Sequence, residues 1–184
     1  MILLIFVNKY DWFKKLNFMT KPTIRIARSG EEEAIHDAHM RSIREVCSKD
    51  HSAAEILVWG NRPLGEKWKE AILSGYVWVV EFEGKICGHG YIRFLEDDSN
   101  DRIKRAHILG LYLTPEVLGQ GLGKQLGKLM IEAAKYKQVK IITLESTLTA
   151  HKFYQQLGFT DTGPKATFEI SGQAIQYFPM ALRI

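Results

Sequence analysis

Three glycines and a lysine stand close together near the middle of the chain, at Gly119, Gly121, Gly123 and Lys124. Glycine permits backbone angles that are closed to other residues and removes side chains, so successive N–H groups can converge on an anion. Beyond the turn, apolar residues recur at helical spacing: Leu122, Leu126, Leu129 and Met130. The amino end of a helix carries partial positive charge and unpaired donors. The pattern therefore predicts a phosphate-binding turn that opens a helix.

The segment before the turn must end a strand. Ile108 to Leu113 is a short apolar run, and Pro115 cannot donate a hydrogen bond to a sheet, so pairing should stop there. A Walker loop needs Gly-x-x-x-x-Gly-Lys-Ser/Thr, which Leu118 and Gln125 rule out. A dinucleotide fingerprint is a poor match, because Gly127 follows the glycine pair one residue too late.

The turn instead resembles the pyrophosphate loop of the GNAT acyltransferases, in which a strand and Pro-Glu are followed by Arg/Gln-x-x-Gly-x-Gly/Ala at the start of a helix. Gly121 and Gly123 occupy the two glycine positions of that motif. Leu118 stands where the family usually has Arg or Gln. This departure removes a side-chain contact and leaves the backbone cradle.

A second segment is also similar to this family. Its motif places Ala, then Phe-Tyr, then Gly-Phe at fixed spacing, and the matching residues are Ala150, Phe153, Tyr154, Gly158 and Phe159. Thr147 replaces the Asn that is common three residues before the Ala. The two segments cover residues 107–160, and with the order of strands upstream the resemblance extends over most of residues 23–184.

The resemblance implies an α/β fold with a mixed, mostly antiparallel sheet that is splayed between its fourth and fifth strands and flanked by helices. Acetyl-CoA would lie in the gap, with its pyrophosphate on residues 119–124 and its pantetheine arm along the backbone of residues 111–113. The implied cofactor-binding residues are Leu111, Tyr112, Leu113, Leu118, Gly119, Gln120, Gly121, Leu122, Gly123, Lys124, Thr147, Ala150, Phe153 and Tyr154.

Direct acetyl transfer needs a base for the amine and an acid for the departing thiolate. Tyr154 matches the usual acid of the family. His107 is a candidate base, since histidine titrates near neutral pH; Glu81, His89 and Glu145 are alternatives. Strand alternation would place residues 107, 109, 111 and 113 on one face. We expect an N-acetyltransferase that acts on a primary amine of a small molecule or peptide; a catalytically silent CoA-binding sensor or interaction domain is the alternative.

Composition limits the remaining options. The 184 residues are 46% hydrophobic and 25% charged, which suits a single domain, expected over residues 19–184 after an extension at 1–18. The net charge of +4 is scattered, so no nucleic-acid partner is predicted. His36 and His39 lack a carboxylate at ligand spacing, and no metal is predicted.

The expected location is the cytoplasm. Cys47 and Cys87 form no disulfide or zinc pattern, and no apolar run reaches the roughly 18 residues of a membrane span. The apolar start of the chain lacks a basic leader and a convincing cleavage site. The aromatic extension leaves a homodimer open.

The remaining periodicity predicts the elements around these motifs. Strands are expected at 23–28, 76–82, 85–94 and 140–144, a closing hairpin at 168–182, a helix from 29 to about 47, and an irregular helical cover over 49–74. Glu83-Gly84 should form a two-residue hairpin turn, and Glu96 to Asp101 an acidic loop. The second to fourth strands should form an antiparallel meander, and the fourth and fifth a right-handed parallel crossover.

Overall fold

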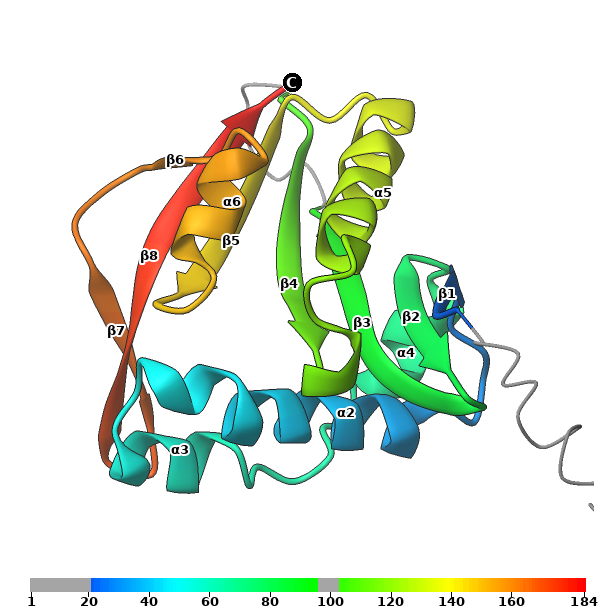
Figure 1. Cartoon of the computed structure of the whole chain (residues 1–184). Coiled ribbons are helices and arrows are strands. Elements are labelled where there is room, and N and C mark those ends of the chain that lie inside the picture. Colours follow the sequence, from blue (N-terminus) through cyan, green and yellow to red (C-terminus); the bar gives the residue numbers. More distant parts are fainter. Residues whose placement is uncertain (1–20, 96–102) are drawn as a thin grey trace, which may run out of the picture.

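The computed structural model describes residues 21–95 and 103–184, so the extension at 1–18 and the loop at 96–101 lie outside the described residues. In the described part, one sheet of eight strands runs in the order β1-β2-β3-β4-β5-β8-β6, with β7 paired to β8 (Figure 1). The strands are β1 (Thr23–Ile26), β2 (Val77–Phe82), β3 (Lys85–Phe94), β4 (Arg105–Leu113), β5 (Ile141–Thr147), β6 (Thr160–Asp161), β7 (Ala166–Ile170) and β8 (Gln173–Arg183).

Helices cover both faces of this sheet. They are α2 (Glu32–Glu45), η1 (Cys47–Lys49), α3 (Ala53–Trp59), α4 (Trp68–Leu73), η2 (Pro115–Val117), α5 (Leu122–Tyr136) and α6 (His151–Gln156). Alternate residues of β2 separate the two faces: Val80 packs in the cluster that holds α5, and Val79 packs with Ile35 of α2. The protein therefore has two apolar layers, one on each side of the sheet.

The α5 layer shows why the predicted helix forms. Leu122, Leu126 and Met130 bury the face toward β3 and β4, whereas Leu129 is 38% exposed at the edge of that face. A third cluster lies under α3, where Met40 and Ile43 of α2 pack with Trp59 and with Ile175 of β8. The irregular cover expected at 49–74 is thus the pair α3 and α4, with a turn between them.

The predicted strand pairings are confirmed. β2, β3 and β4 form an antiparallel meander, and β4 pairs in parallel with β5. Glu83 and Gly84 both have positive φ, 50° and 73°, as a tight hairpin with this pair requires. β5 extends to Thr147, three residues beyond the predicted end, and the two-residue β6 was not predicted. No helix in the described ranges is long and apolar enough to cross a membrane.

Candidate active site

The glycine turn adopts the backbone conformation that its sequence predicts. Gly119 and Gly121 have φ of 73° and 77°, and a Cβ added at either position would meet nothing within 4 Å. Among residues 21–95 and 103–184, no acceptor is found for the backbone N–H groups of residues 119–124, and Gly121 caps α5 without a side-chain bond. An open turn with free donors at a helix amino end is suited to bind a phosphate.

A cavity of about 320 Å³, here named the turn cavity, opens beside these glycines. Eleven of the fourteen predicted cofactor-binding residues line it: Leu111, Tyr112, Leu113, Leu118, Gly119, Gly121, Gly123, Lys124, Thr147, Ala150 and Phe153. The other three, Gln120, Leu122 and Tyr154, do not. Gln120 is exposed and its side chain donates to the Glu116 carbonyl at 3.0 Å, and Leu122 and Tyr154 are buried in the α5 layer.

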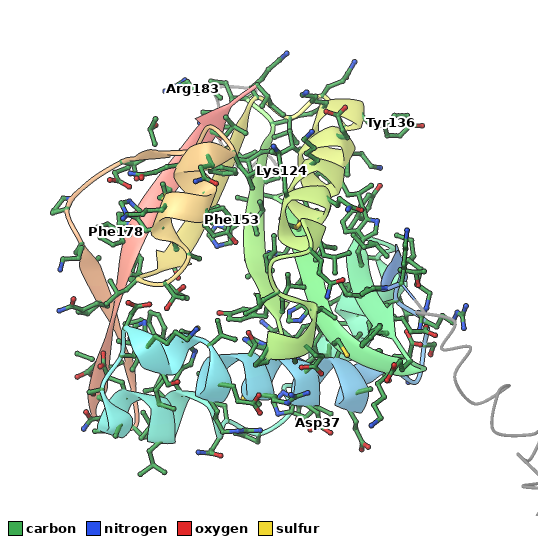
Figure 2. All side chains as sticks on the ribbon, viewed as in Figure 1. Asp37, Lys124, Tyr136, Phe153, Phe178 and Arg183 are labelled. Atoms are coloured by element: carbon green, nitrogen blue, oxygen red, sulfur yellow. The ribbon has the colours of Figure 1, made fainter. Side chains whose placement is uncertain are left out.

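The far wall of the turn cavity is packed closely. A Cβ on Gly123 would lie 3.4 Å from Cε2 of Phe153, so the first turn of α5 approaches α6 in a way that a glycine permits. Figure 2 shows Phe153 on α6 and Lys124 near the amino end of α5, both at the space between the two helices. Lys124 is exposed and can therefore contribute positive charge at the rim.

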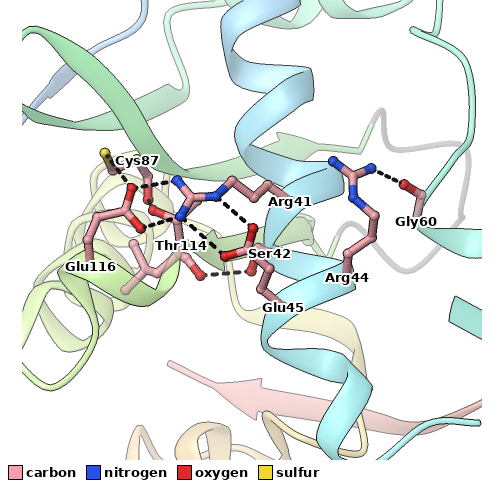
Figure 3. A network of polar contacts seen from close by, with 9 residues as sticks. Arg41, Ser42, Arg44, Glu45, Gly60, Cys87, Thr114 and Glu116 are labelled. Carbon is pink, nitrogen blue, oxygen red and sulfur yellow. Dashed lines mark hydrogen bonds and ion pairs between the residues drawn. The ribbon is translucent and has the colours of Figure 1, made fainter. Parts of the chain in front are cut away.

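Polar contacts from α2 hold the segment that precedes the turn (Figure 3). Arg41 binds both oxygens of Glu116, at 2.6 and 2.9 Å, and Ser42 donates to the Leu113 carbonyl at 2.8 Å. Burial, the largest single influence, opposes ionisation of Glu116, but the hydrogen bonds from Arg41, the backbone, Cys87 and Thr114 together outweigh it and lower the pKa of this carboxyl to about 2. The carboxylate is thus charged at neutral pH, and α2 is fixed to the end of β4.

The sheet splays between β4 and β5. Parallel pairing joins Arg105 to Ile108 with Ile141 to Leu144 and then stops, although both strands continue (Figure 1). The backbone of β4 beyond Ile108 therefore has no strand neighbour on its β5 side. This is the gap that the sequence resemblance implies.

A β-bulge in β4 corrects one prediction. Tyr91 pairs with Gly110 and Ile92 with Ile108, so Leu109 is an extra residue on β4. Leu111 and Leu113 consequently pack in the α5 layer together with Ile108. The expectation that residues 107, 109, 111 and 113 share a face is wrong, because the bulge reverses the alternation within the strand.

The bulge places His107 and the side chain of Tyr112 on the same face of the sheet. Both line a second cavity of about 310 Å³, here named the gap cavity. Its other lining residues are His39, Trp59, Arg62, Ile108, Leu109, Glu145, Thr147, Phe168, Ile175, Gln176 and Tyr177. Tyr112 and Thr147 line both cavities, so the two cavities meet at the point where β4 and β5 separate.

His107 is held by one defined contact. Its Nδ1 lies 2.9 Å from Oγ1 of Thr143, and that hydroxyl lies 3.4 Å from the Ala106 carbonyl, to which it can donate. A hydroxyl that donates to a carbonyl accepts from Nδ1–H, which leaves Nε2 with the lone pair. Burial is the largest influence on the pKa of His107 and lowers it. Glu145 raises this pKa, and Arg93 lowers it. The imidazole is therefore neutral at neutral pH and can accept a proton.

The alternative bases lie in different surroundings. Glu81 binds Arg25 at 2.7 Å and lines neither the turn cavity nor the gap cavity. His89 is 1% exposed, and burial lowers its pKa to about 3. Glu145 is exposed at the gap cavity.

Burial keeps two phenols protonated at neutral pH. Tyr154 is 5% exposed, and burial raises its pKa, so it is protonated at neutral pH. Burial also raises the pKa of Tyr112, and Cys47 and then Tyr154 add to the effect. Sequence reasoning assigned Tyr112 a backbone role only, because it assumed strict alternation along the strand. Gly110, an isolated glycine beside the bulged Leu109, is the local signal that indicates such a bulge.

His39 and Arg62 were also missed. His39 is packed against Tyr112 with ring centroids 3.9 Å apart, and its Nε2 is buried without a hydrogen-bond partner in the described structure. Arg62 follows α3 and reaches the same cavity. Neither residue lies in a motif; only the packing of α2 and α3 against the sheet brings them to the gap.

Known proteins share both sequence and fold with this chain. A profile of the acetyltransferase (GNAT) domain matches residues 47–184. N-acetylaspartate synthetase of Danio rerio is 28% identical over 129 residues, which are 68% of this chain and 41% of that relative. The chain therefore spans less than half the length of that relative.

Solved structures agree with the family match. A GCN5-related N-acetyltransferase from Rhodopseudomonas palustris superposes with a TM-score of 0.72 at 20% identity, over 90% of this chain and 98% of that chain. The PaiA N-acetyltransferase from Thermoplasma acidophilum, solved in complex with coenzyme A, gives 0.65 at 17% identity, over 89% and 99%. These likenesses show the fold. Because the family profile spans well over half of the chain, the chain belongs to the acetyltransferase (GNAT) domain family.

Proposed function

We propose that this protein transfers the acetyl group of acetyl-CoA to a primary amine of a small molecule or peptide. The observation that best supports this proposal is that the turn cavity and the gap cavity meet at Tyr112 and Thr147. The turn cavity extends to the glycine turn, and the gap cavity extends to His107. A cofactor and an acceptor that enter from the two cavities would meet only there. The family membership and the CoA-bound structural neighbour support acetyl-CoA as the co-substrate.

The residues of the turn cavity fit this co-substrate. The free N–H groups of residues 119–124 and the open space above Gly119 and Gly121 suit a pyrophosphate. The unpaired edge of β4 beyond Ile108 suits an extended amide-bearing arm, although Ser42 already occupies the Leu113 carbonyl. When bound, acetyl-CoA supplies an activated acyl group on a good leaving thiol.

The chain's own groups would then move two protons. His107 accepts a proton from the acceptor ammonium at Nε2, directly or through a water, while Thr143 holds its Nδ1–H. The freed amine lone pair forms the new C–N bond, and the C–S bond breaks. The phenol of Tyr154 gives its proton to the departing sulfur, and the second proton that the nitrogen loses as the amide forms restores the phenol. Tyr154 does not line the turn cavity, so this role requires the thioester to reach the junction beside Tyr112.

Turnover with a panel of primary amines tests the proposal. We expect CoA thiol release that depends on both acetyl-CoA and an amine, with an N-acetylated product of the expected mass. Acetyl-CoA that binds calorimetrically while no amine or peptide is acetylated would instead support the silent CoA-binding domain. Leu118 and Thr147, which depart from the family motif and line the turn cavity, are the residues that favour that second candidate.

A further inference from the structure

Arg62 has no carboxylate partner in the part of the chain that the structure describes. It is half-buried, lines the gap cavity, and its Nε donates to the Trp59 carbonyl at 3.2 Å. Within residues 21–95 and 103–184 no carboxylate forms an ion pair with it, and burial lowers its pKa. A charged group is costly to bury unless it is paired, and a guanidinium offers a planar fork that fits a carboxylate. The guanidinium of Arg62 therefore lacks an anionic partner, and a ligand with a carboxylate could supply one.

The same cavity contains a carboxylate that Arg62 does not bind. Glu145, on β5, is exposed at the cavity and forms no ion pair with Arg62. The two opposite charges thus line one cavity as separate groups. A ligand that carries an ammonium and a carboxylate at once would complement both, whereas a simple amine would leave the guanidinium unpaired.

A second polar atom lies beside Arg62. Nε2 of His39 is buried without a partner, and His39 lines the cavity. Burial lowers the pKa of His39 well below its usual value, and the charges of His89 and Arg62 lower it further. The imidazole is therefore neutral, and with its proton on Nε2 it can donate to a ligand oxygen that Arg62 binds.

Part of the remaining wall is apolar. Trp59 and Phe168 meet edge to face with ring centroids 6.4 Å apart, and Ile175 is 1% exposed beneath them. A volume of about 310 Å³ is at the small end of ligand pockets, which run from roughly 300 to 1,000 Å³. Such walls suit one aliphatic or aromatic side chain.

We propose that the acceptor is a free α-amino acid with an apolar side chain, whose carboxylate is bound by Arg62. This inference rests on the proposed function. The carboxylate pairs with the guanidinium and with Nε2 of His39, the side chain packs on Trp59 and Phe168, and the amine points toward His107 and Tyr112. Arg62 then determines substrate specificity by contact with the substrate and takes no part in proton transfer.

Three matched acceptors test the role of the carboxylate: phenylalanine, phenylalanine amide and 2-phenylethylamine. A charge-assisted hydrogen bond is typically worth enough to change kcat/KM by about 10- to 100-fold, and we expect the parent to prefer phenylalanine by that factor. Phenylalanine amide is a demanding comparison, because its amine is less basic than that of phenylalanine and loses its proton more easily. This difference by itself would favour the amide over the acid. Leucine and 3-methylbutylamine repeat the test with an aliphatic side chain.

Two variants assign the preference to a residue. Arg62→Met should remove the preference for the acid while the two acceptors without a carboxylate keep their kcat/KM within about twofold. Arg28→Met, which removes one positive charge at an exposed site outside both cavities, should behave as the parent. Arg62→Lys should recover part of the preference for the acid. It also replaces Arg62→Met as the test variant if Arg62→Met does not fold.

The outcomes separate the two proposals. Equal kcat/KM for acid, amide and amine in the parent overturns the carboxylate site while acetyl transfer stands; so does an Arg62→Met variant that slows all three acceptors alike. If no amine is acetylated at all, the proposed function fails, and titration of phenylalanine into the CoA-loaded protein decides the site. Binding that is lost in Arg62→Met supports it, and absence of binding in the parent overturns it.

Discussion

Replacing Gly121 with either aspartate or asparagine separates the charge of the turn from its shape. Gly121 has φ of 77° with free space around its Cβ position, so either side chain fits and only backbone strain is added. Asn and Asp tolerate this conformation better than other residues, and both carry the same cost of at most roughly 1–2 kcal/mol. The two variants therefore differ in one negative charge beside the free N–H groups of residues 119–124.

The size of the charge effect follows from Coulomb's law. Two unit charges about 5 Å apart repel by roughly 1 kcal/mol in water and by roughly 3 kcal/mol at an effective dielectric constant of about 20. The Kd of acetyl-CoA should then be about 5- to 150-fold weaker for Gly121→Asp than for Gly121→Asn. The difference should shrink as salt is added, since the turn is exposed.

Calorimetric titration of both folded variants measures this ratio, with melting temperatures compared first. S-acetylpantetheine, which lacks the pyrophosphate, is the control ligand and should not distinguish Asp from Asn. Equal Kd values for acetyl-CoA in the two variants would refute the placement of the pyrophosphate on this turn. A ratio that is equally large with S-acetylpantetheine would show that the charge acts elsewhere on the cofactor.

Three further predictions follow from the structure and the sequence. Tyr154→Phe should keep acetyl-CoA affinity and reduce turnover by about 10²–10⁴-fold, the usual range for a general acid, and an unchanged rate with chemistry limiting would contradict that role. His107→Gln should remove the acidic limb of the pH–rate profile; because burial lowers the pKa of His107, the neutral base forms as pH rises through a value below the usual 6.5, and the limb should lie there. The same limb persisting in the Gln variant would assign it to another group. A chain that begins at Met19 should keep its melting temperature and its acetyl-CoA affinity, since residues 1–18 carry no periodic core; loss of folding on truncation would show that the extension packs on the domain or on a second subunit.

Local sequence patterns predicted the parts of the site that are themselves local. The glycine turn and α5 follow from spacing within a single stretch, and the Glu83-Gly84 hairpin follows from the positive φ that its two residues accept. Family resemblance supplied the gap between β4 and β5, which no periodicity indicates. These features depend on neighbours in the chain or on a known motif, so the sequence is sufficient to find them.

The gap cavity could not be predicted in the same way. Arg62 reaches it from the segment after α3, His39 from α2 and Glu145 from β5, and these residues come together only when α2 and α3 pack against the sheet. Leu111 and Leu113 were expected on the face of His107 because strict alternation assumes a regular strand, which the bulge at Leu109 interrupts.

The bulge at Leu109 also decides which side of the sheet each later residue of β4 occupies. If β4 kept Leu109 and were regular, Ile108, Gly110 and Tyr112 would share a face. Tyr112 would then face the α5 layer, and Leu111 and Leu113 would face the gap cavity. Deletion of Leu109 would instead leave a regular strand in which every later residue keeps its present face, because Ile108 and Leu111 would then stand two positions apart.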